Sequence, residues 1–329
     1  MNFNEYLLSL DDDIIELYIQ KRNLVDFPNI ERFYKLEILY CYDNKFTKLS
    51  TLPKTLKILN CSNNKLTELP ILPDTLIILN CSNNQLTNLP TLPIKLENFA
   101  CSNNQLLILP TLPIKLDSFT CSNNQLTNLP TLPKTLLLLI CSNNQLTKLP
   151  VLPNKLKKLT CFNNQLTKLP ILPDSLVLLS CSNNQLIKLP ILLDVLEILH
   201  CSHNQLTYLP VLPNSLDILK CSNNQLINLP ILPNTLIKLY CNNNLIYHII
   251  NTDDINRINH KCDIIRRFRF NYYIQKYSKR FIDFYYKNIV EPRVIARSHP
   301  SNLLKMINEN PNNDITEIIN NFEQQIDIV

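Results

Sequence analysis

The sequence predicts a solenoid: a curved stack of short parallel β-strands with extended returning segments on the convex side, followed by a small α-helical region at the C-terminus. Cysteine recurs every twenty residues from Cys41 through Cys241 without a slip, and self-similarity at a fixed period indicates stacked repeats. The chain of 329 residues also has no glycine and 22 prolines. Its turns must therefore use asparagine, the next residue that tolerates left-handed backbone.

The first half of each repeat has the alternation of a strand. In the pattern xLxCx, Leu59 and Cys61 are predicted to face the core, whereas Ile58, Asn60 and Ser62 face outward. Repeats with the same pattern stack their strands in parallel. Because strands pack closely and the returning segments spread, the stack is expected to curve.

The second half of each repeat has the pattern LPxLPxx, whose prolines remove backbone donors and restrict φ. We therefore expect an extended or polyproline-like segment. Between the two halves, one asparagine recurs from Asn44 to Asn244 where the chain turns out of the strand. Its amide can both donate and accept, so it is predicted to satisfy backbone groups left unpaired at the turn.

Three regions follow from the extent of the repeats. Residues 1–13 are predicted to form an N-terminal cap, and residues 14–250 hold one degenerate and eleven regular copies. Residues 251–329 are predicted to form a helical C-terminal cap that covers the exposed end of the stack, with Thr252 or Asp253 starting a helix. This cap is basic over residues 257–305 and acidic after them.

The motif LxxLxCxxNxL, as in Leu56 to Leu66, matches the core motif of the leucine-rich-repeat superfamily position by position. The full unit with its double LP is similar to the repeats of bacterial secreted effectors. The CSNNQL version in this Asn-rich, Gly-free chain resembles repeat proteins of giant DNA viruses that infect amoebae. The resemblance implies a leucine-rich-repeat solenoid with a strand-lined concave face, but it implies no particular ligand, because this fold has many partners.

The outward strand positions differ from copy to copy while the inward ones hardly change, as a recognition surface requires. Several are large and apolar, and Phe162 replaces a repeated serine. We therefore predict a non-enzymatic scaffold that binds a protein on its concave face; drift on a tolerant surface is the alternative interpretation. The predicted binding residues are Leu138, Ile140, Lys158, Thr160, Phe162, Leu178, Ile198, His200, Ile218 and Lys220.

No cofactor or metal is predicted. A tetrahedral metal site needs four converging ligands, whereas a row of equivalent cysteines offers only neighbours in line, so the cysteines are interpreted as small buried hydrophobes. His200 and His203 lie in one copy without a carboxylate or cysteine placed to form a triad. Catalysis at these histidines is therefore not predicted.

Two alternatives concern the C-terminal region. In the segment 257–305, arginines and lysines alternate with aromatic residues and offer phosphate contacts and base stacking, so nucleic-acid binding is one alternative, disfavoured because aromatics at helical spacing are typical of a core. The other is a ubiquitin-ligase-linked role, because bacterial effectors with similar repeats carry a ligase domain with a catalytic cysteine. Cys262 beside Asp263 is the candidate, but the ligase motif is not reproduced. An adaptor to a ligase is the milder version of this alternative.

The location is predicted to be cytoplasmic, in a host cytoplasm if the chain is viral. The start MNFNEYLLSLDDDIIE has no basic stretch followed by an apolar run, and no eighteen apolar residues occur in succession. We therefore expect reduced thiols and no membrane association. The net charge of +5 by itself favours neither nucleic acid nor an anionic membrane.

Overall fold

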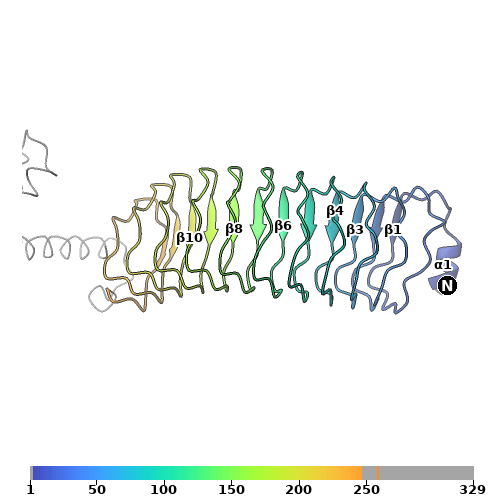
Figure 1. Cartoon of the computed structure of the whole chain (residues 1–329), viewed down its shortest axis with the longest axis horizontal. Helices are drawn as coiled ribbons and strands as arrows, with labels where there is room; N and C mark the ends of the chain where they lie inside the picture. Colours follow the sequence, from blue (N-terminus) through green and yellow to red (C-terminus); the bar gives the residue numbers. More distant parts are fainter. Residues whose placement is uncertain (1–2, 247–257, 259–329) are drawn as a thin grey trace, which may run out of the picture. The chain divides into compact units, whose positions relative to one another are not determined.

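The computed structural model describes residues 3–246 and 258. Its twelve strands form one sheet in which each strand pairs in parallel with the next along the chain (Figure 1). The elements are α1 (Phe3–Leu8), β1 (Glu16–Tyr18), β2 (Ile38–Tyr40), β3 (Ile58–Asn60), β4 (Ile78–Asn80), β5 (Asn98–Ala100), β6 (Ser118–Thr120), β7 (Leu138–Ile140), β8 (Lys158–Thr160), β9 (Leu178–Ser180), β10 (Ile198–His200), β11 (Ile218–Lys220) and β12 (Lys238–Tyr240).

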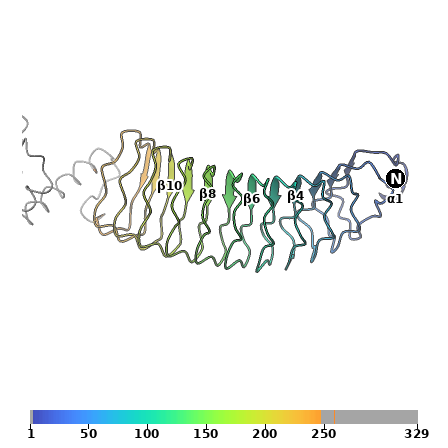
Figure 2. The same cartoon turned by 45° about the horizontal axis from the view of Figure 1, so that its top comes forward.

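The strands stack in strict register. From β2 onward each residue pairs with the residue twenty positions later, as Ile58 does with Ile78, whereas Glu16 of β1 pairs with Ile38, 22 positions later. The degenerate first copy thus joins the same sheet. Figure 2 shows the stack as a shallow arc with the strands along its inner edge and the returning segments along its outer edge. The predicted curved parallel sheet is confirmed.

The core runs through the middle of every turn. In the repeat of β3, the strand residue Leu59 and the following Cys61 are fully buried, as predicted, and Leu66 is buried beyond the corner. In the returning segment, Leu69 and Leu72 are buried while positions 68, 71 and 74 are exposed. This three-residue period of exposure is that of a polyproline-type helix, which has three residues per turn.

From β2 onward a residue pair forms the corner after each strand, and it is Asn-Asn in every repeat except those of Asp43 and His203. The first member has left-handed backbone, with φ of 54° at Asn63 and equivalent values in the other repeats, and His203 adopts the same conformation at 55°. Asparagine thus supplies the turn that glycine supplies elsewhere. His203 is therefore a substitute at a turn position, and its Nε2 lies 3.1 Å from Nδ2 of Asn223 in the next repeat.

The second asparagine of each pair joins its own turn to the preceding one. Asn64 Nδ2 donates to the carbonyl oxygens of Cys61 and Ser62 in its own turn and of Cys41 in the turn before, at 3.1 to 3.2 Å. Its Oδ1 accepts from the amide of Phe46 at 3.1 Å. The same bonds recur along the stack to Asn244. The predicted role of this asparagine is confirmed.

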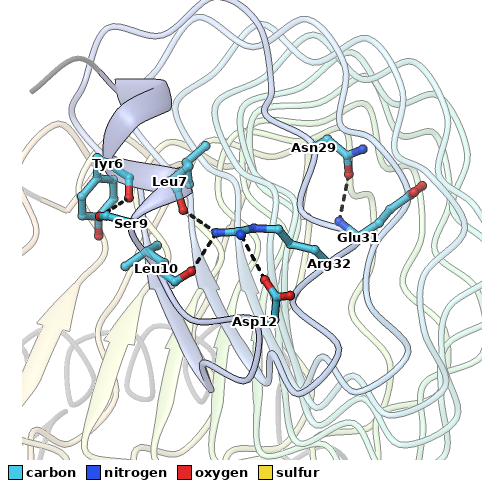
Figure 3. A network of polar contacts seen from close by, with 8 residues as sticks. All are labelled: Tyr6, Leu7, Ser9, Leu10, Asp12, Asn29, Glu31 and Arg32. Atoms are coloured by element: carbon cyan, nitrogen blue, oxygen red, sulfur yellow. Dashed lines mark hydrogen bonds and ion pairs between the residues drawn. The ribbon is translucent and has the colours of Figure 1, made fainter.

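Arg32 ties the N-terminal segment to the stack (Figure 3). Its Nη2 donates to the carbonyl oxygen of Leu7 at the end of α1 and to that of Leu10, the latter at 2.9 Å. Its Nη1 lies 3.0 Å from Oδ1 of Asp12. A helix end leaves carbonyl groups without intrahelical partners, and a guanidinium with five donors is suited to satisfy several of them at once.

Replacing Arg32 is expected to loosen α1 locally. In Arg32→Ala the two carbonyls lose charge-assisted bonds, so we expect opening of residues 3–13 to become easier by about 1 to 2 kcal/mol and their amides to exchange hydrogen about tenfold faster. Hydrogen-exchange mass spectrometry measures this. Lys35→Ala is the control, because its ion pair with Asp13 is exposed on both sides and such pairs contribute little. Equal protection in both variants would contradict this role of Arg32.

The predicted cap over residues 251–329 lies outside the described residues, as do Thr252, Asp253, Cys262, Asp263 and the basic segment 257–305, apart from Ile258. The interpretations placed on them stay predictions. In the part of the chain that the structure describes, no helix has the length and apolar character needed to cross a bilayer.

Candidate functional site

The predicted binding residues form two parallel columns on the concave face. In β1 to β11 the middle residue is buried, while the first and third residues, apart from Ser180 in β9, are half-buried or exposed and point to the same side of the sheet. Nine of the ten predicted residues occupy these two positions in β7 to β11. The first column holds Leu138, Lys158, Leu178, Ile198 and Ile218, and the third-position column holds Ile140, Thr160, Ser180, His200 and Lys220.

The structure corrects one expected orientation. Ser62 was predicted to face outward, but it is buried, with 6% of its surface exposed. Its hydroxyl donates to Oδ1 of Asn60 at 2.7 Å. Several equivalent serines are buried too, because the residue after the cysteine already turns into the corner, where the next repeat packs against it. Ser180, a third-position strand residue, is also buried and offers no contact surface.

Phe162 interrupts a run of hydrogen-bonded serines. The amide of Ser122 donates to Ser102 Oγ and the amide of Ser142 donates to Ser122 Oγ, both at 3.1 Å. In the next repeat Phe162 stands at the serine position and is half-buried. Ser142 is 1% exposed, and among the described residues its hydroxyl has no hydrogen-bond partner. A half-buried aromatic ring thus lies at the edge of the two columns.

The surroundings of His200 lower its pKa and so favour its neutral form. Burial lowers its pKa, and the positive charge of Lys220, its neighbour across the β10–β11 pair, lowers it further. Below this lowered pKa, a second positive charge appears beside Lys220. Apart from Glu16 in β1, the charged residues at the first and third strand positions are the lysines Lys158, Lys220 and Lys238. The face over β7 to β12 is therefore mainly aliphatic, with isolated lysines in β8, β11 and β12.

A tyrosine cluster at the other end of the face was missed by the sequence interpretation. The rings of Tyr18 in β1 and Tyr40 in β2 are stacked, with centroids 5.5 Å apart and planes 9° from parallel. Tyr42 meets Tyr40 edge-on at 6.3 Å, and Lys21 lies 5.9 Å from the centroid of Tyr42. The sequence did carry a signal for this cluster. Tyr18 and Tyr40 are the third residues of their strands, and Tyr42 directly follows a repeat cysteine, as Phe162 does.

The cysteines lie behind the face and are chemically quiet. Those from Cys41 to Cys221 are buried free thiols, and burial raises their pKa, to about 12 for Cys61 and Cys181. They are protonated at neutral pH, and the thiol is the weakly nucleophilic form. Within residues 3–246 and 258, no group of three or more His, Cys, Asp or Glu side chains is gathered for a metal ion.

The fold and this face define a repeat solenoid with a continuous inner sheet of variable residues. A scan against models of protein families and a search of curated proteins find no match. Solved structures do match. YopM from Yersinia enterocolitica WA-314 is 37% identical with a TM-score of 0.63, over 70% of this chain and 56% of that chain. This chain therefore spans little more than half the length of that protein.

Two further structures agree. YopM from Yersinia pestis, a leucine-rich effector protein, is 32% identical with a TM-score of 0.58, over 71% of this chain and 78% of that chain. The leucine-rich repeat domain of APL1B has a TM-score of 0.61 at 23% identity, over 73% of this chain and 79% of that one, and it supports the fold alone. The chain belongs to the leucine-rich-repeat proteins.

Proposed function

We propose that this protein is a non-enzymatic scaffold whose concave face binds a partner protein. The observation that carries the proposal is the contrast between buried positions that are leucine or phenylalanine throughout and variable half-buried positions on a single continuous sheet. In β7 the two variable positions are Leu138 and Ile140, and in β8 they are Lys158 and Thr160. A bound partner accounts for variation confined to this face, whereas drift on a tolerant surface predicts that substitutions there leave binding unchanged.

The chemistry of the face indicates the chemistry of the partner. Leu138, Ile140, Ile198 and Ile218 offer aliphatic contact, and an interface core of this kind needs an apolar counterpart. The lysines at the strand positions of β8, β11 and β12 favour carboxylates opposite them. The partner is therefore a protein surface or segment that combines aliphatic and acidic side chains.

The likeness to effectors supports the same proposal. The Yersinia pestis relative is described as a leucine-rich effector protein, and a binding role in this chain is consistent with that description. A cytoplasmic location, in a host if the chain is viral, and the resemblance to repeat proteins of giant viruses stay predictions. Nucleic-acid binding through segment 257–305 also stays a prediction. If this segment binds nucleic acid, the affinity for nucleic acid falls steeply as the salt concentration rises.

The test is partner capture with the intact chain and a concave-face triple variant, Leu138→Glu, Ile140→Glu and Phe162→Glu. We expect a specific protein to bind the native chain and its retention to fall at least about 100-fold in the triple variant, because three carboxylates replace apolar contacts. Captured proteins are identified by mass spectrometry. Circular dichroism melting checks that the variant is folded.

The control carries the same three charges on the returning segments: Thr91→Glu, Thr111→Glu and Thr131→Glu, all at exposed positions. It is expected to bind like the native chain. A gentler second variant, Lys158→Glu with Lys220→Glu, reverses charge without removing aliphatic contacts and is expected to weaken binding more at low salt than at high salt. Equal capture by all four proteins would overturn the concave-face proposal.

A further inference from the structure

The returning segments carry a row of aliphatic side chains that nothing in the solenoid covers. In five successive repeats the variable position x of the pattern LPxL holds an aliphatic residue that is between 72% and 89% exposed. These residues are Val151, Ile171, Ile191, Val211 and Ile231. We call these five residues the aliphatic ridge. Single exposed aliphatics are common on protein surfaces, but a contiguous exposed set marks a contact site.

The ridge covers one part of the stack. At the same position the earlier repeats carry threonine, at Thr51, Thr91, Thr111 and Thr131, with Ile71 as an isolated aliphatic residue. Solvent-facing turns of this solenoid therefore tolerate threonine, and the fold itself does not demand isoleucine or valine there. The ridge residues belong to the returning segments, which run along the outer edge of the arc in Figure 2, on the opposite side from the strands. It is separate from the concave face.

Charged rows flank the ridge. Because the returning segment has a three-residue period, the residues three positions before and after each ridge residue are exposed on the same side. The preceding row is basic in the first three ridge repeats, with Lys168 before Ile171 and Lys188 before Ile191, and neutral in the last two. The following row holds Asp174 and Asp194 in the same two repeats and asparagine in the other three. In the middle of the ridge, around Ile171 and Ile191, the surface thus has a basic edge on one side and an acidic edge on the other.

We propose that the aliphatic ridge is a dimerisation surface that binds the same surface of a second copy of this chain. A twofold axis that runs along the ridge places the two ridges face to face. It also brings the basic row of each copy opposite the acidic row of the other. Lys168 then meets the second copy's acidic edge at the level of Asp174. An axis across the ridge instead opposes like charges, so the charges select the first arrangement.

The size of the surface sets the expected strength. Two outer faces of shallow arcs touch over a limited length, which suits a ridge of five repeats. The ridge and its flanking rows are smaller than the roughly 20 to 30 residues per side of a standard interface. We therefore expect a Kd on the order of micromolar. The concave faces of both copies point away from the contact and stay free to bind.

Analytical ultracentrifugation of the full chain between about 1 and 100 μM tests the proposal, since this range brackets the expected Kd. The native chain is expected to dimerise, and Ile171→Glu with Ile191→Glu is expected to raise the dimer Kd at least about tenfold. The matched control is Ile71→Glu, an equally exposed isoleucine at the same repeat position outside the ridge. It is expected to dimerise like the native chain.

A charge swap tests the arrangement. Lys168→Glu with Lys188→Glu sets acidic rows against each other and is expected to weaken the dimer; adding Asp174→Lys and Asp194→Lys is expected to restore it. A native chain that stays monomeric up to about 100 μM overturns the proposal. So does equal weakening by Ile71→Glu, or a swap that restores nothing. The concave-face triple variant is expected to dimerise normally, which separates this proposal from the binding function.

Discussion

Raising the pH from about 8 to about 10 is expected to unfold the solenoid cooperatively. The ten thiols from Cys41 to Cys221 are buried, and burial raises the pKa of each above its value of 9.0 in the unfolded chain. Groups with a raised pKa in the folded state stabilise it below the unfolded pKa, and this contribution is lost as the pH rises toward the folded pKa. The window here runs upward from about pH 9.

The magnitude comes from the number of thiols. Each costs on the order of 1.4 kcal/mol per pH unit above the unfolded pKa, so ten cost on the order of 10 kcal/mol per unit. This approaches the whole stability of an ordinary domain, about 5 to 15 kcal/mol. Urea unfolding followed by circular dichroism at steps between about pH 8 and 10 measures the slope.

Three alanine substitutions provide the internal test of the alkaline effect. Cys121→Ala, Cys141→Ala and Cys161→Ala together remove three of the ten titrating groups. The slope of stability against pH is therefore expected to fall by about three-tenths, although stability at neutral pH also falls because cavities form. The slopes are compared, not the absolute stabilities. An unchanged slope would show that the thiols are not the groups that titrate.

Asn124→Ala is expected to destabilise the chain by about 2 to 3 kcal/mol. Asn124 Oδ1 accepts from the amide of Leu106 at 3.0 Å, and its Nδ2 donates to the carbonyl oxygens of Cys101, Cys121 and Ser122 at 3.1 to 3.2 Å. The two cysteine carbonyls keep a second donor from the neighbouring asparagines. The buried amide of Leu106 loses its acceptor, and this orphaned group is the main cost. Urea midpoints at neutral pH measure the change.

Two variants bracket that result. Asn128→Ala removes an exposed side chain of the same repeat and is expected to change stability by less than about 0.5 kcal/mol. Asn124→Asp keeps an acceptor for Leu106 but sets a carboxylate against carbonyl oxygens, so it is expected to be more damaging at neutral pH than in mild acid, where the carboxyl group is protonated. An unchanged midpoint in Asn124→Ala would contradict the role of the asparagines between repeats.

Most of the fold was predictable because the signal is local and repeated. Leucine and cysteine at strand spacing specify inward residues, as Leu59 and Cys61 confirm, and an Asn pair specifies the corner because left-handed backbone favours asparagine when glycine is absent. Eleven copies of one pattern remove the ambiguity that a single copy leaves. His203 is an example. It occupies the position of the first asparagine in the other repeats, and this position assigns it to the turn, although histidine alone predicts no turn.

The candidate site was predictable only in outline. The two variable columns follow from strand alternation, so Leu138 and Ile140 were placed correctly on the concave face. The tyrosine cluster was missed because it joins two repeats separated by 22 residues, and the pairing of Tyr18 with Tyr40 shows only in the sheet register. The burial of Ser62 depends on how closely the following turn packs, which the alternation of a strand does not describe.

The sequence by itself determined the repeat period, the inward and outward positions of each strand and the class of fold, because these depend on contacts within one repeat and its copy. Only the tertiary structure decided which outward side chains remain accessible. Whether a residue such as Ser180 or Ile191 is exposed to solvent depends on how closely the successive repeats pack against each other. That packing buries Ser180, although it occupies an outward strand position, and leaves Ile191 exposed.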